Sequence, residues 1–190
     1  FGLADKVEAM NRASVELARK VAGPDLLVAG SVGPFGECPP GEQPSLARMA
    51  EALHEQAFFL ADAGADFVLF ETVSSRMDLE AALLAAENLP CPCVVNCMMK
   101  ADGPLAEDGM SARDALALIA AARTPISAFG LNCGQGPDET LQALERVKPL
   151  TDLPLIVRPA AGMPKRIDDR MITMCSPEYF TTYALRYAAL

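Results

Sequence analysis

Hydrophobic positions follow two alternating patterns along the chain, and the alternation predicts a β/α fold. Short continuous apolar runs that end at glycine, proline or a polar residue are typical of strands buried in a parallel sheet. Longer segments between them carry apolar residues every three or four positions, as an amphipathic helix does. Five strands are predicted, within 25–34, 66–72, 93–99, 126–133 and 154–159.

A helix is expected ahead of the first strand and another after each strand. Ser111 can cap one of them through Asp114, and Pro137 falls in the first turn of another. Ser176 and Pro177 open the last. The helices are predicted within 3–23, 44–64, 76–89, 112–123, 136–148 and 178–190.

Two architectures fit this order of elements: an open doubly wound sheet or a (β/α)₈ barrel. No G-x-G-x-x-G follows the first strand, so the main sign of a dinucleotide-binding sheet is missing. A closed barrel needs eight strands and about 250 residues. The chain has 190 residues and opens inside a helix, so it is either an open sheet or the middle of a barrel cut at both ends.

Composition limits the class of protein and its compartment, but it does not indicate a reaction. With 51% hydrophobic and 22% charged residues, the chain is ordinary for one globular domain. A net charge of −9 argues against a nucleic-acid partner, and no apolar run approaches the roughly 20 residues of a membrane span. The cysteines lack the spacing of a disulfide scaffold, which makes the cytoplasm the expected compartment. They are Cys38, Cys91, Cys93, Cys97, Cys133 and Cys175.

The loops that follow the strands carry the most specific signal. Four motifs occur in order: VAGSVGPFGE at 28–37, AGADFVLFETV at 63–73, GLNCGQGP at 130–137 and RPAAGMP at 158–164. Together they resemble the homocysteine S-methyltransferase family over essentially the whole chain. This family includes the homocysteine-binding module of cobalamin-dependent methionine synthases and the betaine- and S-methylmethionine-dependent enzymes.

The resemblance implies a (β/α)₈ barrel, of which residues 1–190 would supply about strands three to seven. Family members begin with a strand carrying a D-G-A-x-G-like loop and then a second strand, both of which would precede Phe1. They end with an eighth strand bearing G-G-C-C-G, which would follow Leu190. The chain is therefore expected to be a partial homocysteine-binding domain, truncated at both ends and inactive in isolation.

The resemblance also implies a zinc site at Cys133, shared with the two cysteines of the last strand. A free thiol with a pKa of about 8.5 is mostly protonated at neutral pH. Zinc held by three thiolates keeps a fourth position open, where an incoming homocysteine thiol loses its proton. The alternative is a core cysteine beside a turn. One cysteine cannot complete the site, so the fragment alone is expected to bind zinc poorly.

Two further residues are candidate substrate ligands. Glu71 directly follows four apolar residues, where a charge is costly if it is buried. The matching family glutamate binds the amino group of homocysteine; the alternative is a helix-capping carboxylate. Asn132 either hydrogen-bonds the substrate or orients the loop.

Other positions qualify these assignments. Ala160 replaces the asparagine of the frequent P-N-A-G motif, which in some members fills the open position on zinc. The motif CPCVVNC at 91–97 is interpreted as core and turn residues, because C-x-C without a second pair is a weak metal signal. Glycines 30 and 33 either let the backbone approach a ligand or serve a tight turn.

The leading hypothesis is a cytoplasmic zinc-dependent methyltransferase that activates homocysteine and yields methionine. The methyl donor stays open among methyl-cobalamin on a partner module, S-methylmethionine and betaine, and corrinoid or folate modules are candidate partners. The rival hypotheses are a non-catalytic β/α piece that acts through association, and an unrelated doubly wound enzyme.

Overall fold

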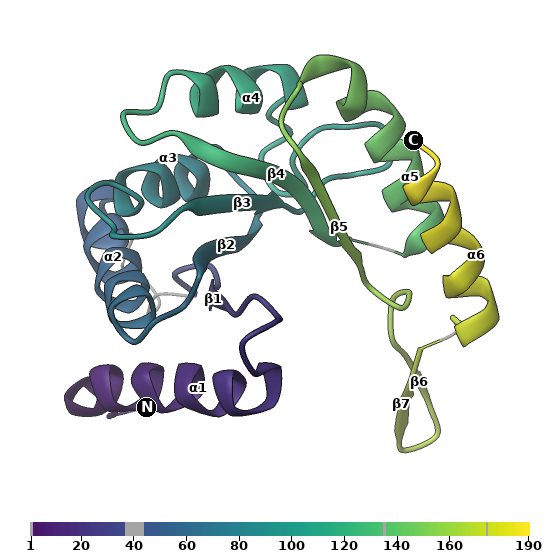
Figure 1. Cartoon of the computed structure of the whole chain (residues 1–190). Helices are drawn as coiled ribbons and strands as arrows, with labels where there is room; N and C mark the ends of the chain where they lie inside the picture. The colour runs from purple at the N-terminus through teal and green to yellow at the C-terminus, as the bar shows by residue number, and fades with distance from the viewer. Residues whose placement is uncertain (1, 37–43, 135, 174) are drawn as a thin grey trace.

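A five-stranded parallel sheet forms the centre of the protein (Figure 1). The computed structural model describes residues 2–36, 44–134, 136–173 and 175–190. Neighbouring strands follow one another in sequence, in the order β1-β2-β3-β4-β5. The strands are β1 (Ala29–Val32), β2 (Phe67–Val73), β3 (Cys93–Cys97), β4 (Ile126–Cys133) and β5 (Leu155–Pro159).

The strand order decides between the two predicted architectures. A doubly wound sheet reverses direction at a switch point, and its helices cover both faces. Here the order advances in one direction, and the helices between strands lie on the convex side of a curved sheet (Figure 1). This is the winding of a β/α barrel, and the predicted barrel class is confirmed.

Each predicted helix is present. Ser111 accepts a hydrogen bond from the Asp114 amide, Pro137 begins its helix, and Ser176 caps the last one. None of the helices in the described part of the chain has the length and apolar character needed to cross a membrane. They are α1 (Val7–Ala22), α2 (Leu46–Asp62), α3 (Arg76–Ala85), α4 (Ala112–Ala120), α5 (Pro137–Val147) and α6 (Pro177–Ala188), with 3₁₀ turns η1 (Ala4–Lys6) and η2 (Lys148–Leu150).

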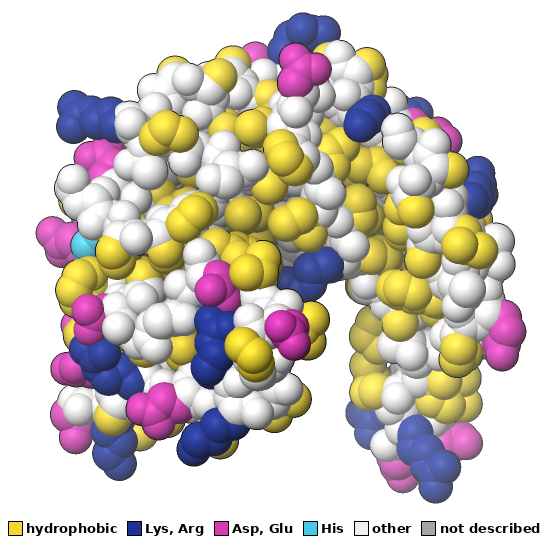
Figure 2. Space-filling view, in the orientation of Figure 1, with side chains coloured by type: hydrophobic (Ala, Val, Ile, Leu, Met, Phe, Trp, Pro, Cys, Tyr) yellow, Lys and Arg dark blue, Asp and Glu magenta, His cyan; other side chains and the backbone are white. Residues whose placement is uncertain are grey.

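The two faces of the sheet pack differently. On the convex face, Phe70, Phe129 and Leu79 belong to the main core between sheet and helices. On the concave face a smaller cluster joins β2, β3 and β4, with partly buried neighbours on β2 and β5. Figure 2 shows hydrophobic side chains gathered in the hollow between the α1 side of the molecule and the arm formed by α6 and the β6–β7 hairpin. The small cluster consists of Leu69, Val94 and Ala128, with Phe67 and Ile156 against it.

The prediction that the first strand is buried on both faces is wrong. Burial alternates along β1: Val32 is buried, whereas Ala29 and Ser31 are exposed. Leu26 and Leu27, which belong to the predicted run, are 63% and 76% exposed and precede the strand. The physical reason is that β1 is an edge strand whose helix-facing side alone is covered.

An antiparallel hairpin after β5 was not predicted. It pairs β6 (Lys165–Ile167) with β7 (Arg170–Ile172), and all six of its strand residues are exposed. Asp168 makes the turn with a φ of 54°. Strands of three residues carry too little periodicity to be recognised, and the turn lacks the glycine that usually marks a hairpin.

Replacing Ser75 with alanine is expected to lower the free energy of unfolding by about 1 kcal/mol. Ser75 and Asp78 form a capping box, in which each side chain accepts a hydrogen bond from the other residue's amide. Urea unfolding measures the loss. Ser14→Ala on the exposed surface of α1 is the matched control, because it removes a hydroxyl from a helix interior without removing a cap. Equal stability of both variants would contradict the prediction.

Candidate functional site

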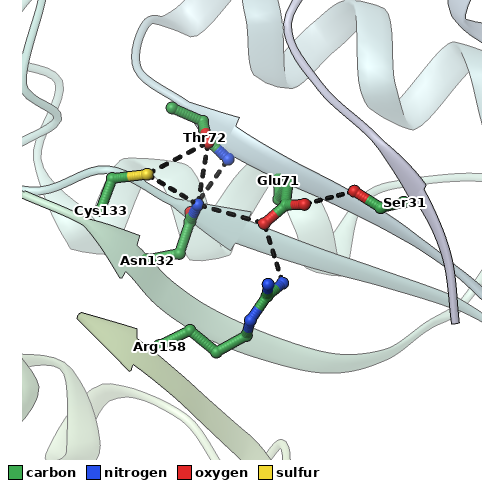
Figure 3. Close-up of polar contacts among 6 residues, drawn as sticks. All are labelled: Ser31, Glu71, Thr72, Asn132, Cys133 and Arg158. Carbon is green, nitrogen blue, oxygen red and sulfur yellow. Dashed lines mark hydrogen bonds and ion pairs between the residues drawn. The ribbon is translucent and has the colours of Figure 1, made fainter. Parts of the chain in front are cut away.

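Polar side chains gather at the carboxyl end of the strands, on the concave face (Figure 3). Alternate residues of a strand share a face, so Glu71 lies beyond Leu69 on β2, and Asn132 lies beyond Gly130 on β4. The parallel register pairs Asn132 with Arg158 of β5. The apolar cluster of the concave face is therefore followed by a polar layer at the edge where barrel enzymes place their active sites.

Glu71 is the most connected residue of this layer. One carboxylate oxygen accepts a hydrogen bond from the Ser31 hydroxyl. The other lies 2.8 Å from Nη1 of Arg158 and 3.4 Å from Nδ2 of Asn132. The Glu71 side chain is 19% exposed, and the guanidinium offsets the cost of partly desolvating its charge. Sequence analysis expected a substrate ammonium to do this; the protein itself supplies one cation.

Asn132 joins β4 to β2. The residue is 4% exposed, and its Oδ1 accepts a hydrogen bond from the Thr72 amide at 2.9 Å. Its Nδ2 donates to Thr72 Oγ1 at 2.8 Å and lies 3.3 Å from Cys133 Sγ. Both ends of the amide are thus engaged by the protein, which places Glu71, Thr72 and Cys133 around one side chain.

Two residues of the cluster adopt strained backbone conformations. Thr72 has a φ of 63° and Cys133 a φ of 57°, in the left-handed region that β-branched residues strongly disfavour. Thr72 lies where the pairing of β2 with β3 shifts register, between Phe70 and Val73. Such conformations cost about 1–3 kcal/mol each and concentrate at functional sites. Two hydrogen bonds between Asn132 and Thr72, one in each direction, hold Thr72 in this conformation.

Cys133 ends β4 with its sulfur turned toward this cluster. The residue is half-buried, and Sγ lies 3.5 Å from Thr72 Oγ1. Its carbonyl oxygen accepts a hydrogen bond from the Ala160 amide at 3.0 Å. Ala160, which occupies the asparagine position of the P-N-A-G motif, therefore lies beside Cys133. Its methyl side chain cannot bind a metal ion.

The described residues supply part of a metal site. No three His, Cys, Asp or Glu side chains among them come together in a way that would hold a metal ion. Cys133 combines a half-exposed thiol with neighbouring hydrogen-bond donors, which suits one ligand of a thiolate-rich site. A site with three protein ligands that includes Cys133 would need at least one of them from outside the described residues.

The cysteines of the CPCVVNC motif have a different setting. Cys93 and Cys97 are fully buried in the core, which confirms their interpretation as core residues. Burial raises the pKa of the Cys93 thiol to about 12, and it raises the pKa of the Cys97 thiol as well. Both thiols stay protonated at neutral pH and are inert core groups. Cys38 lies outside the described residues.

Sequence reasoning missed three members of the cluster: Ser31, Thr72 and Arg158. Each lies inside a motif that was singled out: Ser31 is the second residue of GSVGP, Thr72 directly follows Glu71, and Arg158 begins RPAAGMP. Strand parity and register place Ser31 and Arg158 on the face of Glu71, whereas Thr72 joins them through its left-handed backbone at the register shift of β2. The two glycines of GSVGP differ: a Cβ atom at Gly30 would lie 2.8 Å from Leu60 Cβ of α2, whereas one at Gly33 would have nothing within 4 Å.

Fold and site together define a β/α-barrel protein with a carboxylate, an amide and a thiol at the carboxyl edge of its strands. The family model of homocysteine S-methyltransferases matches residues 1–189. The chain belongs to the homocysteine S-methyltransferase family.

Individual relatives agree with this assignment. The chain is 34% identical over 166 residues to the homocysteine S-methyltransferase of Escherichia coli, covering 78% of this chain and 53% of that protein. It is 28% identical over 176 residues to the methionine synthase of Mycobacterium leprae, covering 86% of this chain and 14% of the relative. The chain thus spans about half the length of the first relative and a small part of the second.

Solved structures give the same result. The apo crystal structure of the E. coli homocysteine methyltransferase MmuM superposes with a TM-score of 0.71 at 32% identity, covering 85% of this chain and 64% of that one. Its metallated form gives a TM-score of 0.68 at 31% identity, covering 80% and 58%.

Replacing Gly130 with alanine is expected to destabilise the protein by about 3 kcal/mol. A Cβ atom at this position would come closer than 3.0 Å to the Asn96 side chain and to the main-chain carbonyl of Ile156. The carbonyl belongs to β5 and cannot move without breaking sheet pairing. Chemical denaturation of Gly130→Ala measures the loss. Gly33→Ala is the control, because nothing lies within 4 Å of the added methyl group; an equal effect of the two would overturn the argument.

Proposed function

We propose that the chain forms the homocysteine-binding part of a homocysteine S-methyltransferase, which transfers a methyl group to the homocysteine sulfur and yields methionine. One observation carries the proposal. The Asn132 amide contacts both the Glu71 carboxylate and the Cys133 sulfur, at 3.4 Å and 3.3 Å. Because both groups contact the same nitrogen, one small molecule can reach both, and homocysteine carries its ammonium group and its sulfur at the two ends of a three-carbon unit.

Each residue then has a distinct task. Glu71 accepts the ammonium group of the substrate and thereby orients it. Asn132 holds Glu71 and Cys133 in position from between them. Cys133 supplies one thiolate ligand to zinc, which when bound lowers the pKa of a thiol in its open position. The strain at Thr72 and Cys133 supports a functional role for this cluster.

We propose further that the chain is part of a longer barrel and corresponds to about its third to seventh strands. The 64% coverage of the MmuM chain supports this assignment. The other two zinc ligands would be cysteines outside the chain. A methyl donor is the second substrate, and methionine synthase relatives make a corrinoid or folate module a candidate partner. The cytosol is the proposed compartment, because all cysteines among the described residues are free thiols.

The test uses the protein with its complete barrel. Metal content is measured first, and one zinc ion per chain is expected. Homocysteine is then supplied with S-methylmethionine, betaine or methyl-cobalamin, and methionine is quantified. Formation of methionine with at least one donor is the expected result. A protein that neither retains zinc nor binds homocysteine would contradict the proposal and favour the non-catalytic hypothesis.

A further inference from the structure

We propose that Arg158 binds the α-carboxylate of the substrate, so that Arg158 and Glu71 together select a zwitterionic α-amino acid. The proposal rests on the proposed function and deepens it. It assigns the selection of an α-amino acid at the same site to Arg158, a residue that contacts neither the thiol nor the ammonium group of the substrate.

The ion pair has an inner and an outer member. Nη1 of Arg158 lies 2.8 Å from Oε2 of Glu71, and the two side chains are 53% and 19% exposed. Glu71 is therefore the more buried partner of the contact drawn in Figure 3, and Arg158 is the more exposed one. A ligand that enters from the open side meets the guanidinium first.

The Arg158 guanidinium has further N–H groups that can donate hydrogen bonds to such a ligand. Arginine carries five N–H groups in a planar fork, a geometry that suits two parallel hydrogen bonds to a carboxylate. Among the described residues, the structure gives Arg158 one hydrogen-bond partner, Glu71. The rest of the fork belongs to a side chain that is more than half exposed, so a carboxylate can bind there without displacing the ion pair.

Glu71 keeps room for an ammonium group at the same time. A carboxylate has about four acceptor positions, and Glu71 uses three of them, for Ser31, Asn132 and Arg158. A bound zwitterion would then place its positive group beside Glu71 and its negative group beside Arg158, which gives four alternating charges. A simple amine would meet the guanidinium without any compensating charge of its own.

Register places the three recognition points around one position. Arg158 pairs with Asn132 across β4 and β5, and Cys133 follows Asn132 at the end of β4. The substrate sulfur lies toward Cys133 on β4, the ammonium at Glu71 on β2 and the carboxylate at Arg158 on β5, the strand next to β4. This arrangement assigns the carboxylate to β5.

The test compares ligands with and without a carboxylate. Zinc-loaded protein with its complete barrel is titrated calorimetrically with L-homocysteine and with 3-aminopropane-1-thiol, which has the same amine and thiol but no carboxylate. We expect the wild type to bind homocysteine about 10- to 100-fold more tightly, as hydrogen bonds between charged groups allow. In Arg158→Met this preference disappears, because homocysteine loses affinity and the amine thiol does not. Arg158→Lys keeps part of it.

The other outcomes separate the alternatives. An equal loss of affinity for both ligands in Arg158→Met would show that Arg158 only positions Glu71, and an unchanged homocysteine affinity would show that it has no role; either overturns the proposal. Equal binding of both ligands by the wild type would contradict the contact between Arg158 and the substrate carboxylate but leave the proposed function intact. Binding of neither ligand would contradict the proposed function itself. Arg123→Met, which removes an exposed ion pair with Glu87, is the matched control and leaves both affinities unchanged. Zinc content is measured for every variant and stays constant.

Discussion

Replacing Cys133 with serine is expected to lower zinc affinity at least about 100-fold and to abolish methyl transfer in the protein with a complete barrel. Loss of an outer-shell partner of a metal ligand already costs about 10- to 100-fold, and loss of a ligand costs more. A serine hydroxyl stays protonated at neutral pH and is a poor replacement for a thiolate. The hydroxyl still hydrogen-bonds with Asn132 and Thr72, so the fold is retained.

Zinc content after dialysis and a competitive chelator titration measure this effect. Cys91→Ser is the matched control. Cys91 precedes β3 at the opposite end of the sheet, and burial raises the pKa of its thiol, which disfavours metal binding. The control is expected to keep its zinc. Full zinc retention in Cys133→Ser would remove Cys133 from the metal site.

Replacing Glu71 with glutamine is expected to weaken homocysteine binding about 100-fold while zinc content stays unchanged. Removing one partner of a desolvated charge pair costs roughly 2–5 kcal/mol. The glutamine carbonyl can still accept hydrogen bonds from Arg158 and Asn132, and its amide nitrogen can donate to the Ser31 hydroxyl, so the local geometry is kept. The substrate ammonium then loses its counter-charge and meets the positive charge of Arg158.

Calorimetric titration with homocysteine, alongside metal analysis, provides the measurement. Glu80→Gln is the control, because Glu80 pairs with Arg76 on α3, away from the polar layer. Its homocysteine affinity is expected to match the wild type. Intact affinity in Glu71→Gln would show that Glu71 serves only as the structural partner of Arg158.

Much of the fold is predictable from local pattern. The apolar run of 66–72 and the helical spacing of 44–64 each express one periodicity over enough residues to be recognised. Strand β2 is displaced from its predicted range by one residue, and α2 begins and ends two residues inside its own. The three-residue strands of the hairpin and the one-sided burial of β1 escaped this reasoning. The hairpin strands are too short to show a period. The burial of β1 depends on its position at the edge of the sheet, which the local sequence does not reveal.

The candidate site divides in the same way. Glu71, Asn132 and Cys133 were found because they lie in motifs at the ends of apolar runs. Ser31 and Arg158 were not, although both lie in quoted motifs. Arg158 is 87 residues from Glu71 along the chain, and no local pattern relates the two.

Chain order and periodicity were sufficient for the succession of strands and helices, since both arise from neighbours a few residues apart. Three things were decided only when distant strands came together: the one-directional winding of the sheet, the strained turn at Thr72 held by Asn132, and the ion pair between β2 and β5. The reason is register, because a shift of one residue between two parallel strands turns every side chain to the other face.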